Sequence, residues 1–184
     1  VREARLTPSE AVEHMRIRLP DRGNRKLRRV LERANADKVL KGWWHVSNVN
    51  AVVRLEINDH SWVHIQIVAN IALKLLRQLT KNGVEPSVVR DFGMTGDDAE
   101  MVVVLAALTH CVGMSVHSRG HEDWSLFLSE PKLHQLLDGI RVHQGIAHGH
   151  HAAQRVTDED GTLHAQCLEE LFGVAGVRVH AVRH

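Results

Sequence analysis

A long apolar stretch that ends in two potential metal ligands constrains this chain more than any other feature. Residues 101–108 read MVVVLAAL, and His110 and Cys111 follow just before the chain reaches a glycine. Thr95 opens the segment, with Asp98 three residues later, a pairing that is typical of helix starts. A helix that is apolar around its whole circumference is usually buried in a core. The sequence therefore predicts a buried helix that carries His110 from the core to an accessible turn.

A second helix is predicted from Ser61 to Leu79, with Asp59 or Ser61 as its N-cap. Its apolar residues form one stripe, on which His64 is expected to point inward. The stripe consists of Val68, Ile71, Ala72, Leu75, Leu76 and Leu79. A histidine on an apolar face is also compatible with a packed core residue that binds nothing. His60, one turn earlier, and the inward His110 favour a metal site.

The order of these motifs resembles the HD-domain superfamily of metal-dependent phosphohydrolases. The two segments are HSWVHIQIVANIALKLL, which contains His64, and LAALTHCVGMSVHSRGHEDWSLFL, which contains His110. More narrowly, they are similar to a prokaryotic branch that reads roughly NDHGPVH and then LAALLHDIGMSVHR, followed by HEE. The likeness covers about residues 44–137. Where the family has His-Asp, this chain has His110-Cys111.

The resemblance implies an all-α, HD-domain-like helical bundle with a divalent metal ion, either Mn, Fe, Mg or Zn, held between helices. It also implies a small phosphorylated ligand, such as a nucleotide or another phosphoester. The residues that match the family's metal ligands are His64, His110 and Cys111 in place of Asp, with Asp158 as a weak match for a late Asp. The positions implied for a second metal ion or the phosphate are His117, His121, Glu122 and His60.

Cysteine in place of aspartate changes the chemistry expected of such a site. A thiolate binds zinc or iron well, but it cannot bridge two hard cations through two oxygens or act as a carboxylate base. We therefore expect weak magnesium and manganese binding and impaired hydrolysis. The alternative for Cys111 is a buried thiol that packs as a small apolar side chain. Nucleophilic catalysis is disfavoured, because His110 and Cys111 point about 100° apart on a helix.

Length and composition indicate a soluble, cytoplasmic protein of ordinary domain size. The chain has 184 residues and a formal net charge of +1, which does not point to nucleic acid as the main partner. Its two cysteines do not make a disulfide framework. No apolar run is expected to reach the roughly 18 residues of a membrane helix, and the N-terminus lacks a signal pattern. The oligomeric state is left open.

Three regions are distinguished by composition. Residues 1–42 form a basic helical segment with twelve Lys or Arg against six Asp or Glu. Such a run is usually a solvated helix face; a phosphate- or RNA-binding patch is the alternative, although no interleaved aromatics support base stacking. Residues 43–140 form the HD-like domain of five or six helices. Residues 141–184 hold seven of the fifteen histidines and are expected to be a weakly structured tail, truncated or divergent from the family pattern.

Three functions are compatible with these features. The first is a metal-dependent phosphohydrolase that is impaired at Cys111. The second is a non-catalytic HD-like module that binds a metal ion or a phosphorylated ligand. The third is a helical interaction protein that contacts RNA or an acidic partner through its basic N-terminal segment.

Overall fold

The computed structural model describes residues 12–140, and every regular element within them is helical. The α-helices are α2 (Arg25–Ala36), α3 (Lys38–Asn48), α4 (Trp62–Lys81), α5 (Ser87–Phe92), α6 (Gly96–Thr109) and α7 (His121–Leu137). A π-helical turn, Val49–Arg54, extends α3, and a 3-10 turn, Val112–Ser115, follows α6. The all-α prediction is confirmed, as is the expected number of helices. The predicted tail and Asp158 lie outside the described residues.

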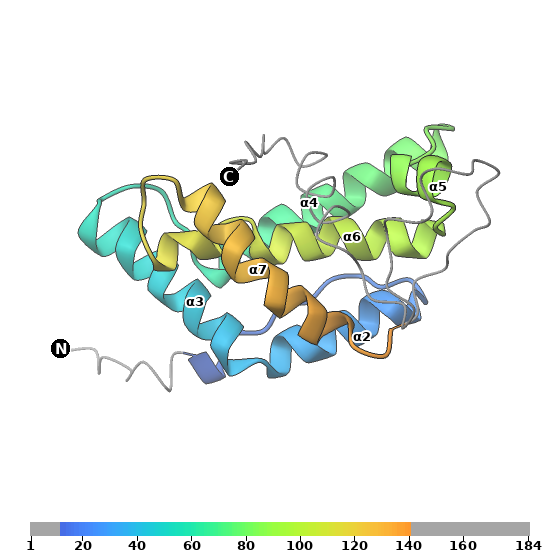
Figure 1. The fold of residues 1–184 in the computed structure, drawn as a ribbon. Coiled ribbons are helices and arrows are strands. Elements are labelled where there is room, and N and C mark those ends of the chain that lie inside the picture. The colour runs from blue at the N-terminus through green and yellow to red at the C-terminus, as the bar shows by residue number, and fades with distance from the viewer. Residues whose placement is uncertain (1–11, 141–184) are drawn as a thin grey trace, which may run out of the picture.

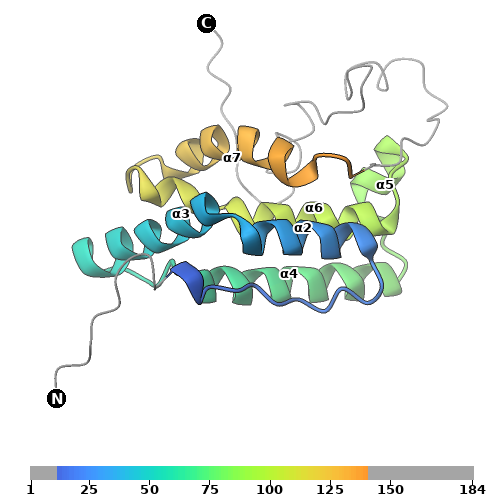
Figure 2. The same ribbon diagram turned by 90° about the horizontal axis from the view of Figure 1, so that it is seen from below.

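Helix α6 is the centre of the bundle. Figure 2 shows α4 below α2 and α6, with α7 above them, and Figure 1 shows α7 crossing in front of α6. Met101, Val104 and Leu108 on α6 have no exposed surface. The predicted capping box is present, since Thr95 accepts a hydrogen bond from the Asp98 amide and Asp98 accepts one from the Thr95 amide. The buried helix expected from the sequence is therefore confirmed.

The stretch Gly96–Ser115 is long and apolar enough to cross a membrane, which the sequence analysis did not expect. The 3-10 turn that continues from α6 supplies the additional length. However, 78% of its most apolar window is buried inside the bundle. Because neighbouring helices already cover this surface, the stretch is a core helix.

The boundary predicted between residues 42 and 43 falls inside α3. Leu27, Val30 and Ala34 of α2 are fully buried and belong to the same core as α6. Helix α2 is therefore part of the domain rather than a segment beside it. Of the adjacent tryptophans, Trp44 is fully buried, while Trp43 packs at the edge beneath the Lys132 ammonium group.

Two of the five basic side chains of α2, Lys26 and Arg33, are partly buried and bind neighbouring helices, whereas Arg25, Arg28 and Arg29 stay exposed on the solvated face that the sequence favoured. Lys26 forms a salt bridge with the fully buried carboxylate of Asp98. Arg28 pairs with Asp21, with 2.9 Å between Nε and Oδ2. Arg33 donates from Nη1 to a backbone carbonyl near the end of α7, at 2.7 Å. These contacts attach α2 to the neighbouring elements and leave fewer of its charges free for a partner.

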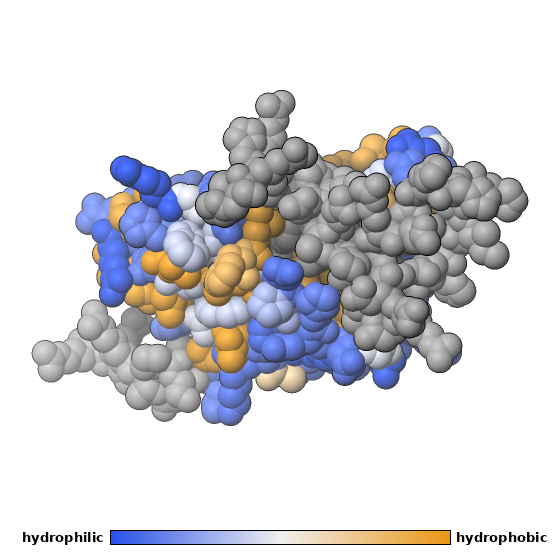
Figure 3. Space-filling model, viewed as in Figure 1, coloured by the Kyte–Doolittle hydropathy of each residue, from blue (hydrophilic) through white to orange (hydrophobic). Residues whose placement is uncertain are grey.

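The buried face of α4 differs from the predicted stripe. Ile65, Ala69 and Leu73 are buried, whereas Ile71 is 62% exposed and Leu75 is 56% exposed. Helix α4 carries apolar residues on more than one face, so spacing alone selected the wrong one. Other apolar side chains are also exposed, and Figure 3 shows some of them among polar ones on the face formed by α3 and α7.

Candidate metal centre

Two helix ends bring His64 and His110 together. Ser61 caps α4 by accepting a hydrogen bond from the Val63 amide, so His64 lies in the first turn of the helix. His110 is the C-cap of α6, where the buried helix gives way to the 3-10 turn. Helices α4 and α6 pack side by side, and this places the start of one helix beside the end of the other.

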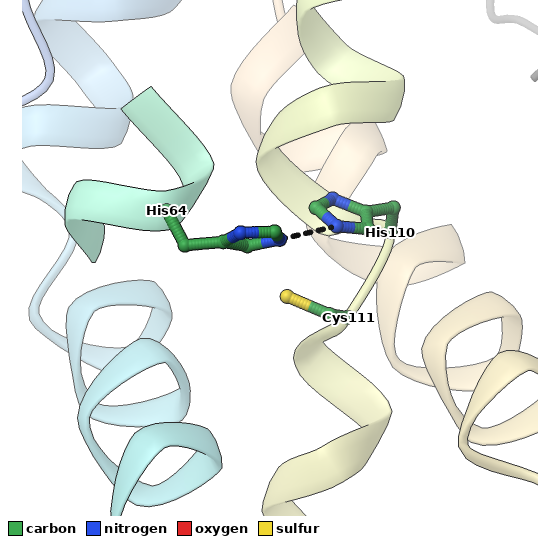
Figure 4. A group of neighbouring side chains, drawn as sticks. All are labelled: His64, His110 and Cys111. Atoms are coloured by element: carbon green, nitrogen blue, oxygen red, sulfur yellow. Dashed lines mark hydrogen bonds between the residues drawn. The ribbon is translucent and has the colours of Figure 1, made fainter. Parts of the chain in front are cut away.

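His64, His110 and Cys111 form a compact group of possible ligands. The Nε2 atoms of His64 and His110 are 3.3 Å apart. One ligand atom from each of the three residues lies within 4.8 Å of the others. Figure 4 shows the imidazoles facing each other and the thiol directed toward the same space. The two inward histidines that the sequence analysis singled out thus meet at one place, and this group can hold a metal ion.

Backbone carbonyls fix the protonation of several histidine rings. His110 Nδ1 lies 2.9 Å from the carbonyl oxygen of Ala107, which can only accept a hydrogen bond. Nδ1 therefore carries the proton, and Nε2 presents its lone pair toward His64. The Nδ1 atom of His60 likewise lies 2.7 Å from the Asn58 carbonyl oxygen, and the Nδ1 atom of His121 faces a carbonyl oxygen of the preceding loop. A carbonyl on the outer nitrogen is the usual support for a metal-binding histidine.

Burial sets the charge states of the three side chains. It lowers the pKa of His64 and of His110, and neighbouring histidines lower both further. Burial also raises the pKa of Cys111 to about 12, with a further contribution from the negative charge of Asp59. The imidazoles are therefore neutral at pH 7, as metal ligands must be. The thiol keeps its proton until a metal ion displaces it.

Polar side chains of α3 and its π-helical extension hold the turn that carries Cys111. Trp44 Nε1 donates to the carbonyl of residue 108 at 2.9 Å, and Ser47 Oγ donates to that of residue 111 at 3.3 Å. Asn50 Nδ2 donates to the carbonyl of residue 114 at 2.8 Å. The donors, at positions 44, 47 and 50, and the acceptors, at positions 108, 111 and 114, both recur every three residues. This row satisfies carbonyls that a helix end leaves unpaired, and it fixes the backbone at the candidate site.

Gly113 permits helix α7 to approach this turn. A Cβ atom at this position would lie 2.0 Å from the His121 carbonyl oxygen and 2.5 Å from the Ser125 amide nitrogen. The Gly113 amide itself donates to Ser125 Oγ at 2.8 Å. The glycine therefore allows the N-terminus of α7, which carries His121, to lie against the turn that carries Cys111.

The structure places a row of four histidines at the site. The His60 ring stacks on His64 with centroids 5.6 Å apart, and His121 meets His60 edge-on at 6.4 Å. His110 completes the row on the other side of His64. Glu122 lies beside His121, with 3.5 Å between Oε2 and Nδ1, and half of its side chain is exposed.

His117 does not join this row. Its ring is exposed and contacts only the backbone of Arg119 among the described residues. The family resemblance implied that His117 and His121 both serve a second metal ion or the phosphate, but Gly120 precedes a new helix in a left-handed conformation. The turn at residue 120 separates the directions of the two side chains.

Asp59 is a neighbour of the site that the sequence analysis treated only as a possible cap. Its carboxylate accepts hydrogen bonds from the Ser61 amide at 3.0 Å and from the Ser61 hydroxyl at 2.9 Å. Its charge affects the pKa of both His64 and Cys111. Its position immediately before the helix that carries His64 is the feature of the sequence that could have indicated this role. Among residues 12–140, the compact ligand group itself contains no carboxylate.

Comparison with known proteins adds a relative but no function. No family model matches the chain, and no solved structure matches it. The uncharacterized protein MJ1020 of Methanocaldococcus jannaschii is 40% identical over 93 residues. The match covers 50% of this chain and 36% of that protein, so the chain spans about a third of the relative's length. The resemblance to the HD-domain superfamily therefore stays a prediction.

Proposed function

We propose that this chain is a metal-dependent phosphohydrolase of the HD type whose centre takes a zinc-class ion through His64, His110 and Cys111. The observation that carries the proposal is the 3.3 Å separation of the two Nε2 atoms beside the thiol. Two imidazoles bound at about 2.1 Å in a tetrahedral site are about 3.4 Å apart. The histidines thus have the spacing of ligands to one ion without any rearrangement.

The donor set favours a soft ion. Two imidazole nitrogens and a thiolate suit Zn²⁺ or Fe²⁺, while Mg²⁺ and Mn²⁺ prefer oxygen ligands. Three protein ligands would leave a fourth position open, as in catalytic zinc sites. An ion bound here would lower the pKa of a coordinated water toward about 7 and neutralise phosphoryl oxygens.

Residues around the proposed ion would bind the phosphorylated substrate. His60 and His121 have their Nδ1 atoms on backbone carbonyls, so their Nε2 atoms are free to meet a ligand. When protonated, each Nε2 can donate to a phosphoryl oxygen. Glu122 lies next to His121 and borders the same position. These contacts would orient the phosphoester against the open position.

The first experiment tests the metal site, and its design has to separate this site from the other histidines and the other cysteine. Seven histidines and Cys167 lie in residues 141–184, so all variants are made in a Cys167→Ser background. Co²⁺ titration then reports a thiolate-to-metal charge-transfer band that arises only from Cys111. We expect the band in the parent protein and its loss in His110→Ala. The exposed His134, which lies outside the ligand group, provides the control His134→Ala. A band of equal strength in His110→Ala would refute the site.

The second experiment tests hydrolysis. The zinc-, iron- and manganese-loaded proteins are assayed with bis(p-nitrophenyl) phosphate and with a nucleoside triphosphate. Activity should depend on the ion and should be lost in both His64→Ala and His110→Ala, but kept in His134→Ala. Activity that survives the loss of His64 and His110 would refute a role for this centre.

A second candidate function, a non-catalytic metal- or phosphate-binding module, is favoured by the buried Cys111. A thiolate cannot serve as a carboxylate base, and the ligand group holds no carboxylate among the described residues. The module would bind the ion without turning over a phosphoester. The variant Cys111→Asp should raise the affinity for Mn²⁺ by at least about tenfold, because it restores an oxygen ligand. An unchanged Mn²⁺ affinity would show that position 111 does not contribute a ligand.

A further inference from the structure

A groove lies along the outer side of α4, away from the candidate metal centre. Its volume is about 440 Å³, and it is formed by the second half of α4 and the segment around Pro20 and Arg22. Arg77 joins the two parts by donating from Nη1 to the Pro20 carbonyl at 2.7 Å. Figure 2 shows the N-terminal segment running along α4, on the lower side of the bundle.

The groove is lined by four cations and no carboxylate. These are Arg22, Lys74, Arg77 and Lys81. The nearby acidic groups already have partners: Asp21 is paired with Arg28, and Glu100 with Arg77 through two contacts of 2.6 and 2.8 Å. Within residues 12–140, no carboxylate lies within 4.0 Å of the charged groups of the other three cations. Three of the four cations thus have no carboxylate partner among the described residues, and such a cluster attracts a polyanion.

Apolar and amide groups complete the lining. Pro20, Ile71 and Leu73 give the groove an apolar part, and Asn70 and Gln78 contribute amides. Lys74 and Lys81 lie seven residues apart on one helix, which corresponds to about 10 Å along its axis. This arrangement suits a ligand with several phosphates in a row better than a single phosphate.

The backbone at Arg22 is held in an uncommon conformation. Arg22 has a φ of +49°, in the left-handed region, and Gly23 follows with a φ of +89°. Asp21 Oδ1 accepts a hydrogen bond from the Gly23 amide at 2.9 Å, and Arg28 fixes the same carboxylate. A left-handed residue other than glycine costs free energy and is maintained only where its surroundings impose it. Here the turn positions Arg22 at the mouth of the groove.

We propose that this groove binds a polyphosphate chain, either free or as the triphosphate of a nucleotide. Lys74 lies ten residues after His64 on α4, about 15 Å along the helix axis, so the groove is separate from the metal centre. The proposal does not depend on metal binding or on hydrolysis. It also places a basic site on α4, apart from the basic helix α2 that the sequence pointed to.

The test compares two exposed lysines that form no ion pair within the described residues, Lys74 in the groove and Lys38 at the start of α3. Binding of tripolyphosphate and of ATP to the full chain is measured by calorimetry with EDTA present, at about 0.1 M salt. We expect Lys74→Glu to weaken tripolyphosphate binding by at least about tenfold and Lys38→Glu by less than about twofold. Thermal melting confirms that both variants are folded.

The two ligands distinguish the sources of the polyphosphate. Tighter binding of ATP than of tripolyphosphate, with the same loss in Lys74→Glu, would assign the apolar part of the groove to a nucleoside. Binding of tripolyphosphate alone would assign a free polyphosphate. Equal losses in both lysine variants, or no loss in Lys74→Glu, would overturn the proposal. Binding of a single-stranded RNA without any binding of tripolyphosphate would also overturn it.

Discussion

Substitution of Gly113 by alanine tests how α7 is joined to the turn that carries Cys111. The added Cβ atom would lie 2.0 Å from the His121 carbonyl oxygen, 2.5 Å from the Ser125 amide nitrogen and 2.8 Å from the Trp124 Cβ. Two of these atoms belong to the backbone of a helix start, which cannot rotate away as a side chain can. The N-terminal turn of α7 must therefore move outward.

The loss in the free energy of unfolding caused by Gly113→Ala has two contributions. Overpacking a well-packed site costs about 1 to 3 kcal/mol, and contact with rigid backbone favours the upper end. Movement of α7 also breaks the hydrogen bond from the Gly113 amide to Ser125 Oγ, which contributes about 1 kcal/mol. We therefore expect Gly113→Ala to lower the free energy of unfolding by about 3 to 4 kcal/mol. For a chain of this size, the melting temperature should fall by about 10 °C.

Gly42 in α3 is the matched control. A Cβ atom there meets no other atom within 4 Å, and the residue lies inside a helix. Gly42→Ala should stabilise the protein by roughly 0.5 to 1 kcal/mol, because alanine has the higher helix propensity. Both variants are compared by urea denaturation and thermal melting. A Gly113→Ala variant as stable as the parent would refute the close approach of α7.

Three other predictions concern the charges and the thiol. Asp98→Ala should destabilise the protein by about 3 kcal/mol in urea denaturation, because it removes the fully buried partner of Lys26 and half of a capping box. In a Cys167→Ser background, iodoacetamide should alkylate metal-free Cys111 at about pH 8 at least tenfold more slowly than a free cysteine, because burial raises its pKa to about 12. Burial lowers the pKa of His64 and His110 below 6.5. As the pH falls, these two histidines therefore take up protons at a higher pH in the unfolded chain than in the folded protein. The free energy of unfolding of the metal-free protein should thus be highest above pH 6.5 and fall below it, and His110→Ala should reduce this dependence in denaturant titrations at several pH values.

Local patterns predicted the helices and the meeting of His64 with His110. Capping residues and the continuous apolar run are properties of short segments, and both were found where expected. The buried face of α4 was not predictable in this way, because Ile71 and Leu75 are as apolar as the residues that do face the core. Which face is covered depends on the packing of other helices.

Long-range polar contacts also escaped prediction. The pairing of Lys26 with Asp98 joins residues 72 positions apart, and nothing in either local sequence indicates the other. The same holds for Trp44 and the carbonyl of residue 108, which are 64 positions apart. The sequence therefore indicated a solvated basic helix, whereas tertiary structure supplied partners for most of its charges.

The hydrogen bonds that hold the turn around Cys111 end on main-chain carbonyls, which bears on how the candidate site can evolve. The contact from Ser47 to residue 111 does not involve the side chain at that position. Any residue there receives the same anchoring of its backbone, so exchange of a carboxylate for a thiol alters the chemistry at position 111 and leaves its placement unchanged. The turn therefore holds the backbone of position 111 in place whatever side chain it carries, and a single substitution there can change which ion the candidate site would favour.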